Sequence, residues 1–190
     1  MEDSSVASMR REQIVRAALE LYEQKGIDRT SVKDITERAG ITRSLFYHYF
    51  ERKEEVTDAI LDRYVDGFTG AVCAWNEGRT RLDVAGALRD CVALLRRELF
   101  GRDAFRELLL KDENASLYLR FLQSSAEAVA RYLTETTAED YVRYHKIEIS
   151  CVYESFYLLV FGLIGYLRQH PDAPDDVIAA LIADTLHLDL

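Results

Sequence analysis

The sequence predicts an all-α protein, and three observations support that fold class. Apolar residues recur at intervals of three and four along most of the chain, which is the spacing of amphipathic helices. Runs of alternating apolar and polar residues, which are typical of strands, are nearly absent. The two prolines, Pro171 and Pro174, both lie near the C-terminus, so long uninterrupted helices are allowed almost everywhere else.

The first predicted helix carries an apolar stripe at Ile14, Ala17, Ala18 and Leu21 and ends at Gly26. A second, short helix is predicted to start at Ser31, which has the capping-box spacing to an acidic residue three positions on, and to end at Gly40. Its apolar stripe consists of Val32, Ile35 and Ala39.

A third helix is predicted to begin after Thr42, a favoured N-cap residue, with Phe46, Tyr49 and Phe50 along one side. Two short helices joined by a tight turn that contains glycine, and packed on a preceding helix, form a helix-turn-helix. We therefore expect an N-terminal three-helix helix-turn-helix head at residues 1–52.

A longer helix is predicted from about Lys53 to Trp75, with Gly78 closing it. Its apolar stripe consists of Ile60, Tyr64, Phe68, Val72 and Trp75. Further helices are expected at about 81–99, 103–112, 115–133, 138–169 and 175–188. The long helix that begins near Lys53 is expected to join the head to a C-terminal helical body at residues 53–190.

Charge is distributed unevenly along the chain. Residues 1–53 contain ten Lys and Arg against nine Asp and Glu, and residues 54–190 contain fourteen against twenty-four, which gives the net charge of −9. A strongly acidic segment repels the phosphate backbone of nucleic acids. If the protein binds nucleic acid, the first fifty or so residues must therefore provide the contact.

The composition is ordinary for a soluble protein, with 48% hydrophobic and 30% charged residues. The longest apolar run, at 158–167, is about half the roughly 20 residues needed to span a bilayer. The three cysteines, Cys73, Cys91 and Cys151, are spaced too widely for a zinc site and are odd in number. We expect a cytoplasmic protein without membrane association and with buried, unreactive thiols.

The stretch GITRSLFYHYFERKEE at 40–55 is rich in aromatic residues. On a helical wheel, Phe46 and Tyr49 point one way, while the opposite arc holds Arg43, Ser44, Leu45, Tyr47 and His48. The inner aromatic residues are expected to belong to the core. The outer ones, beside Arg43, offer hydrogen-bond donors suited to phosphate oxygens and base edges.

From Arg11 to Val56 the chain resembles the DNA-binding region of the TetR family of bacterial transcriptional regulators. The matching features are ALELYEQKG at the end of the first helix, TSVKDI at the start of the second, RAGIT in the turn, and YHYF followed by KEE. The sequence departs from the family pattern at Leu45, where a small or hydroxylic residue is common, and at Thr36, where Ala is common.

The resemblance implies a set of DNA contacts. Residues at the positions that usually meet the major groove are Thr42, Arg43, Ser44 and Leu45. Those at positions that grip the backbone or its nearest bases are Tyr47 and His48. Phosphate contacts are implied for Thr30 and Ser31 at the start of the second helix and for Lys53 at the start of the fourth.

The family also acts as dimers that read two half-sites of double-stranded operator DNA. The last two predicted helices provide a candidate interface, whose residues are Ser155, Leu159, Gly162, Tyr166, Val177, Leu181, Ile182 and Leu188. An intramolecular core is the alternative explanation of these stripes.

Family members usually hold a small-molecule effector in an apolar cavity of the body, and effector binding changes operator affinity. The candidate lining residues are Trp75, Cys91, Phe105, Tyr118, Phe121, Tyr153, Glu154 and Tyr157. Each could equally belong to an ordinary core. Glu154 stands out because a carboxylate in an apolar segment must bind a cationic ligand, pair with an arginine or face solvent.

An enzyme is not predicted, because no sequence motif for a nucleophile elbow, a phosphate-binding loop or a zinc protease occurs. His145 and Glu148 are three positions apart and could lie on the same side of a helix, but two ligands do not make a metal site. No cofactor or metal is therefore expected. The expected function is a DNA-binding repressor released by an effector. A family activator or a helical protein-interaction module without DNA binding are the alternatives.

Overall fold

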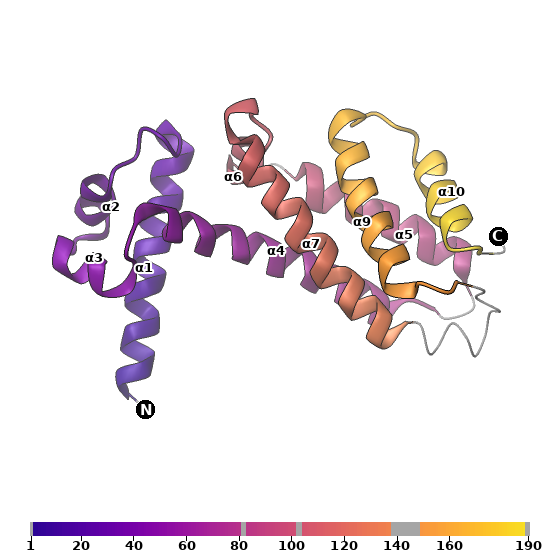
Figure 1. Cartoon of the computed structure of the whole chain (residues 1–190), viewed down its shortest axis with the longest axis horizontal. Coiled ribbons are helices and arrows are strands. Elements are labelled where there is room, and N and C mark those ends of the chain that lie inside the picture. Colours follow the sequence, from indigo (N-terminus) through magenta and orange to yellow (C-terminus); the bar gives the residue numbers. More distant parts are fainter. Residues whose placement is uncertain (1, 81–82, 102–103, 138–148, 189–190) are drawn as a thin grey trace. The chain divides into compact units, whose positions relative to one another are not determined.

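The computed structural model describes residues 2–80, 83–101, 104–137 and 149–188, and every regular element within these ranges is a helix (Figure 1). The elements are α1 (Glu2–Lys25), α2 (Val32–Ala39), α3 (Arg43–Tyr49), α4 (Lys53–Gly78), α5 (Val84–Phe100), α6 (Ala104–Leu109), the 3-10 turn η1 (Asp112–Asn114), α7 (Ala115–Thr136), α9 (Val152–Gln169) and α10 (Asp175–Thr185). The predicted all-α fold class is confirmed.

The described chain forms two compact units. The N-terminal unit consists of residues 2–64 and 104–115, and the C-terminal unit consists of residues 65–101 and 116–188. Helix α4 therefore contributes its first half to one unit and its second half to the other. The compact units divide within α4, after residue 64. The domain boundary expected after residue 52 stays a prediction.

Some helices differ in extent from their predicted ranges. The described part of the helix expected over 138–169 begins only at Val152, since residues 149–151 are not helical and Cys151 has φ −117° and ψ 72°. No Gly or Pro occurs at residues 149–151, so the sequence pattern could not indicate that α9 begins at Val152. Helix α10 ends at Thr185, because His187 adopts a left-handed φ of 51° and the Leu188 N–H bonds back to the Ala183 carbonyl at 2.9 Å.

Local capping signals define the short helix α2 as the sequence predicts. Ser31 is its N-cap, and its hydroxyl accepts a hydrogen bond from the Asp34 N–H while the Asp34 carboxylate accepts one from the Ser31 N–H at 2.8 Å. Gly40 closes the helix with φ 64°, a left-handed conformation that favours glycine. The Lys25 ammonium lies 2.9 Å from the same carboxylate.

The core of the N-terminal unit forms where α1, α2, α3 and the first half of α4 bury their apolar stripes. Its fully buried members include Ile14, Val15, Ala18, Ile35, Phe46, Val56 and Ile60. Tyr22 is also fully buried, and its hydroxyl and that of Thr57 lie 3.0 Å apart in a hydrogen bond. Burial raises the pKa of Tyr22 to about 12, so the phenol stays neutral and links α1 to α4.

Helix α6 completes this unit by covering the side of α4 next to α1. Phe105 is fully buried and stacks on Tyr64 with ring centroids 4.6 Å apart. Asn114 in η1 donates a hydrogen bond to the Leu108 carbonyl at 2.8 Å, which holds the turn that leads to α7. Phe105 therefore serves the packing of the N-terminal unit.

The C-terminal unit packs the second half of α4 together with α5, α7, α9 and α10. Phe68 and Phe121 meet edge to face with ring centroids 6.2 Å apart, which joins α4 to α7. The Tyr118 hydroxyl donates to the Ile164 carbonyl at 3.1 Å, and the Arg168 guanidinium lies 4.0 Å from the centre of the Tyr118 ring. These contacts join α7 to α9.

Arg96 ties α5 to the loop before α10. Its Nε donates to the Asp175 carboxylate at 3.0 Å, and its terminal nitrogens donate to the carbonyls of Pro171 and Ala173.

None of the described helices is long and apolar enough to cross a membrane.

The capping box predicts a pH-dependent stability. Hydrogen bonds from Lys25 and then Ser31 lower the pKa of Asp34 well below its usual value, so its stabilising contribution is present above about pH 4 and is lost as the pH falls below that value. We expect Asp34→Asn to lower the free energy of unfolding at pH 7, and the difference from wild type to shrink at pH 2.

Urea unfolding at the two pH values measures this difference. The matched exchange Asp28→Asn removes one negative charge from a neighbouring exposed position and serves as the control. An Asp34→Asn deficit of the same size at both pH values would contradict the assignment.

Candidate nucleic-acid interface and ligand cavity

The turn between α2 and α3 sets how α3 begins. After the left-handed Gly40, Thr42 adopts an extended conformation and caps α3, with its hydroxyl accepting from the Leu45 N–H at 3.2 Å. The Gln13 amide of α1 donates to the Ala39 carbonyl at 2.6 Å at the end of α2. Both helices of the pair are therefore fixed by polar contacts at the turn.

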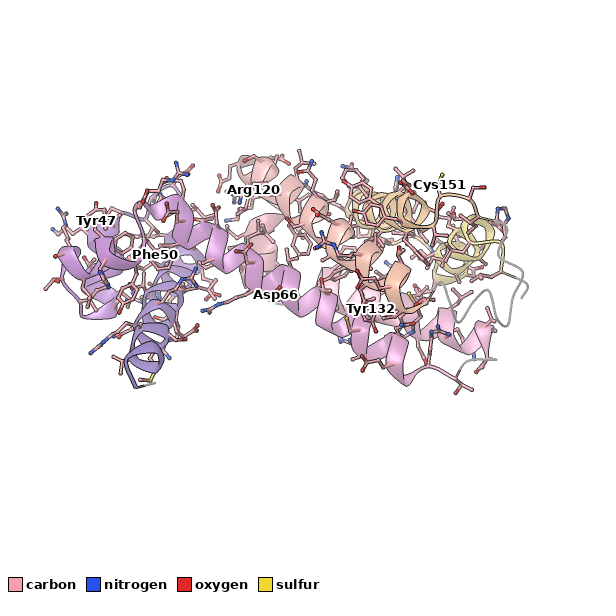
Figure 2. All side chains as sticks on the ribbon, turned by 60° about the horizontal axis from the view of Figure 1, so that its bottom comes forward. Tyr47, Phe50, Asp66, Arg120, Tyr132 and Cys151 are labelled. Carbon is pink, nitrogen blue, oxygen red and sulfur yellow. The ribbon has the colours of Figure 1, made fainter. Side chains whose placement is uncertain are left out.

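The two sides of α3 differ as the helical wheel predicts. Phe46 is fully buried and Phe50 nearly so, with ring centroids 5.9 Å apart, and Tyr49 is half-buried. Tyr47 is 55% exposed and lies on the outside of the N-terminal unit, whereas Phe50 lies between its helices (Figure 2).

The outer side of α3 brings most of the predicted base and backbone contacts together. Its exposed members are Thr42, Arg43, Ser44, Tyr47 and His48. They offer a guanidinium, three hydroxyls and an imidazole within two helical turns, groups that bond phosphate oxygens and base edges. Leu45 is half-buried and presents only part of its side chain to this side.

The residues expected to contact phosphate are placed differently. Thr30 is only 2% exposed, and its hydroxyl donates to the Gly26 carbonyl at 2.8 Å, so this side chain holds the turn before α2. Ser31 is exposed, but its N–H is bonded to Asp34. A Thr before a helix does not by itself indicate whether its hydroxyl faces solvent or bonds within the turn.

Lys53 begins α4 and is half-buried. Its ammonium donates to the Ile27 carbonyl at 2.9 Å, which connects the start of α4 to the loop between α1 and α2. An ammonium has three N–H donors, so this bond is compatible with a second one to a phosphate. Lys53 thus has a structural contact that the sequence did not indicate.

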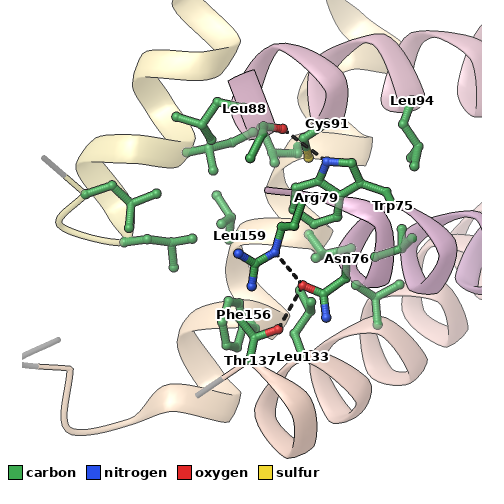
Figure 3. Close-up of a pocket in the computed structure, with 18 of the residues that line it drawn as sticks. Trp75, Asn76, Arg79, Leu88, Cys91, Leu94, Leu133, Thr137, Phe156 and Leu159 are labelled. Atoms are coloured by element: carbon green, nitrogen blue, oxygen red, sulfur yellow. Dashed lines mark hydrogen bonds between the residues drawn. The ribbon is translucent and has the colours of Figure 1, made fainter. Parts of the chain in front are cut away.

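A cavity of about 160 Å³ lies within the C-terminal unit (Figure 3). Of the predicted lining residues, Trp75 and Cys91 border it. The Trp75 indole N–H donates to the Ala87 carbonyl at 3.0 Å, and burial raises the pKa of the Cys91 thiol to about 12. The thiol is therefore neutral. The expectation that all three thiols are buried is wrong, because Cys73 and Cys91 are half-buried and Cys151 is exposed.

The structure places the other six predicted pocket residues away from this cavity. Phe105 belongs to the N-terminal unit, and Tyr118 and Phe121 pack in the core beside α9 and α4. Tyr153, Glu154 and Tyr157 lie on α9, whose cavity side carries Val152, Ser155, Phe156, Leu159, Val160 and Leu163. That i, i+3, i+4 pattern turns the other three away, and Glu154 is exposed.

The predicted dimer residues divide into two groups. Ser155, Leu159, Ile182 and Leu188 border the cavity. The others lie on the outside of α9 and α10: Gly162 is exposed, and Tyr166, Val177 and Leu181 are 38–41% exposed. Leu158, which the sequence reasoning missed, joins this outer group with 66% of its surface exposed.

Sequence reasoning also missed the polar residues of the cavity. Asn76 Oδ1 accepts hydrogen bonds from Arg79 Nε at 2.8 Å and from the Thr137 hydroxyl at 3.2 Å (Figure 3). The Asn76–Arg79 spacing of three was available as a signal, whereas Thr137 directly follows the end of α7, far away in the sequence. No group of three His, Cys, Asp or Glu suited to a metal ion occurs among the described residues, and His145 and Glu148 lie outside them.

The two sides of α3 predict unequal effects of substitution on stability. We expect Phe46→Ala to lower the free energy of unfolding by about 3–5 kcal/mol, because it removes a fully buried ring, and Tyr47→Ala to change it by less than about 0.5 kcal/mol. Chemical denaturation measures both values. Equal losses for the two variants would show that the inner and outer sides are assigned wrongly.

Comparison with known proteins identifies the helix-turn-helix region. Residues 14–60 match the family described as "Bacterial regulatory proteins, tetR family". The HTH-type transcriptional repressor KstR2 of Rhodococcus jostii (strain RHA1) is 36% identical over 69 residues, which cover 36% of this chain and 34% of KstR2. The chain thus matches about a third of the length of this curated relative.

Solved structures extend the likeness in fold to nearly the whole chain. The crystal structure of RolR in complex with resorcinol has a TM-score of 0.61 at 21% identity, covering 98% of this chain and 91% of RolR. The TetR family repressor AlkX from Dietzia sp. strain DQ12-45-1b has a TM-score of 0.63 at 19% identity, covering 93% and 95%. Residues 14–60 are thus similar to the helix-turn-helix region of the tetR family of bacterial regulatory proteins, and the solved structures show the same fold over nearly the whole chain.

Proposed function

We propose that the protein is a sequence-specific DNA-binding regulator that represses transcription in the bacterial cytoplasm by binding a near-palindromic operator as a homodimer. The observation that carries this proposal is the outer side of α3, where Arg43, Ser44, Tyr47 and His48 are exposed together. KstR2, which is similar to this chain over the same region, is named a transcriptional repressor, and this favours repression over activation.

The proposed contacts follow from the chemistry of each side chain. Arg43 and Ser44, in the first turn of α3, read base edges in the major groove, with Thr42 and Leu45 beside them. Tyr47 and His48 donate to phosphates or the nearest bases. Ser31 and Lys53 contact flanking phosphates, and Thr30 supports them by holding the turn.

Charge favours the same orientation on DNA. Residues 1–53 carry a net charge of +1, from ten basic and nine acidic residues, whereas residues 54–190 carry −10, from fourteen and twenty-four. An operator is therefore repelled least by residues 1–53 and most by the remainder of the chain. The two recognition helices of a dimer supply the contacts that a single seven-residue helix lacks.

The proposed dimer interface is the outer side of α9 and α10, formed by Leu158, Gly162, Tyr166, Val177 and Leu181. Four of these side chains are large and apolar yet 38–66% exposed, and such patches are typical of protein interfaces. A Cβ added at Gly162 would meet nothing within 4 Å, so this position leaves room for close approach by a second copy.

The proposed effector site is the cavity of the C-terminal unit. Helix α4 borders it with Phe68, Val72 and Trp75 and begins with the proposed phosphate contact Lys53. A ligand changes operator affinity only if it binds one conformation of the protein better than another. We infer that the effector does so by displacing α4.

DNA binding should depend on Arg43. We expect Arg43→Ala to weaken binding to the operator by about 10- to 100-fold, because a bidentate contact to a base is worth about 1–3 kcal/mol, and to weaken binding to unrelated DNA much less. The operator is found by selecting bound sequences from a random pool, and affinities are measured at two salt concentrations.

The control is Arg89→Ala, which removes an exposed arginine from α5 in the acidic remainder of the chain. A wild-type protein without salt-dependent, sequence-selective DNA binding would favour the protein-interaction alternative. An increase in transcription from the operator would instead favour an activator.

Dimerisation should depend on the exposed apolar side of α9 and α10. We expect Leu158→Arg combined with Leu181→Arg to give a monomer at micromolar concentration, since two buried charges without partners oppose association. Light scattering measures the mass. Leu119→Arg, at a 47% exposed position on α7, is the matched control and should leave a dimer; a monomeric wild type would refute the interface.

A further inference from the structure

The volume of the cavity in the C-terminal unit limits what it can hold. At about 160 Å³ it is close to the roughly 150 Å³ of an engineered apolar cavity that stays dry and binds benzene. A ligand that fills the cavity without rearranging its walls therefore has about the size of one aromatic ring with a short substituent.

The walls of the cavity are almost entirely apolar. Helices α4, α5, α7 and α9 all contribute apolar side chains, among which are Phe68, Val72, Leu88, Leu133 and Phe156. Water between such walls finds few hydrogen-bond partners, so an apolar group that takes its place gains free energy. The parts of a ligand that meet these walls should therefore be apolar.

Several neutral polar groups at the cavity are already bonded within the protein. The Trp75 indole N–H donates to the Ala87 carbonyl at 3.0 Å, and the Thr137 hydroxyl donates to Asn76 Oδ1 at 3.2 Å. The Asn76 amide nitrogen donates to the Tyr132 hydroxyl at 3.3 Å. A ligand that took over one of these partners would leave another donor or acceptor without its hydrogen bond.

Two ionised side chains border the cavity within the described residues, Arg79 and Asp83, and both are held by protein groups. The Asp83 carboxylate caps α5 by accepting from the Gly86 N–H at 2.8 Å. Arg79 Nε donates to Asn76 at 2.8 Å (Figure 3), and Arg79 has a further interaction within the protein. The two side chains also have opposite charges, so together they offer a charged ligand no net counter-charge.

The other polar side chains of the described lining are uncharged. Thr80 and Ser155 carry hydroxyls, and the Cys91 thiol stays protonated because burial raises its pKa to about 12. A hydroxyl can bond an ion but cannot neutralise it, and an ion that moves from water into an apolar cavity needs a paired charge. The described lining therefore favours a ligand without a charge of either sign.

We propose that the cavity binds an uncharged, largely apolar compound of about one ring, such as a small aromatic hydrocarbon, and discriminates against ionised compounds of the same size. This inference rests on the proposed effector site and names the chemistry of its ligand. The affinity comes from removing the apolar surface of the ligand from water, and an ionised group on the ligand would oppose it.

Three probes of nearly equal size and different charge at neutral pH test the proposal: toluene, benzoate and benzylamine. Each is titrated into the full-length protein without DNA. Trp75 is the one tryptophan of the chain and borders the cavity, so its fluorescence reports occupancy, and calorimetry gives the affinity. We expect toluene to bind at least about tenfold more tightly than either ion, because each ion loses its hydration without gaining a paired charge.

A matched pair of cysteine substitutions locates the bound probe. Cys91 borders the cavity, whereas Cys73, on α4, does not, and both are half-buried free thiols. Cys91→Leu fills part of the cavity and should weaken toluene binding at least about tenfold, whereas Cys73→Leu should leave it unchanged. The melting temperatures of the free variants report whether both are folded, and the probe series on the wild-type protein decides the charge of the ligand whatever the variants do.

Three results would overturn the proposal: benzoate or benzylamine binding as tightly as toluene, a folded Cys91→Leu variant leaving toluene binding unchanged, or no probe binding at millimolar concentration. Failure of the regulator proposal is a separate outcome. Toluene bound in the cavity of a protein that binds no operator would sustain the ligand assignment alone, and operator binding without any probe binding would sustain the regulator alone.

Discussion

The burial of Phe46 is the constraint on which the proposed DNA-binding surface depends. Helix α3 has seven residues, fewer than an isolated helix needs to be stable in water, so tertiary packing must hold it. Phe46, fully buried, and Phe50, 3% exposed, provide that packing and fix the rotation of the helix about its axis. Once these rings face inward, the helical period turns Arg43, Tyr47 and His48 outward.

Much of the N-terminal unit could be predicted because its signals are local in sequence. A capping box, a left-handed glycine and an N-cap threonine each act within four residues, and the structure confirms all three at Ser31, Gly40 and Thr42. The contacts of Thr30 and Lys53 could not be predicted in the same way. Both side chains bond backbone carbonyls whose position depends on how the loop after α1 folds.

The cavity was predicted less well, because its lining depends on the rotation of five helices relative to one another. Periodicity states which residues of a helix share a side, but it does not state which side meets the cavity. On α9 the sequence favoured Tyr153 and Tyr157 for the cavity and Leu159 for the interface. In the structure Leu159 instead borders the cavity. The rings of Tyr153 and Tyr157 stack on each other, with centroids 6.3 Å apart, on a side of α9 that does not border the cavity.

Helix α9 is apolar on two sides, and this property connects the two proposed roles of the C-terminal unit. One side, with Leu159, borders the cavity, and another, with Leu158, is exposed. A helix with two apolar sides gains stability when both are covered, so the proposed partner on the outer side and the proposed ligand on the inner side would each stabilise α9. Helix α10 has the same arrangement, with Ile182 inside and Leu181 outside. Because the proposed ligand site and the proposed interface share these two helices, a small rotation of either helix would change both contacts at once, and the free energy of one binding event would be linked to the other.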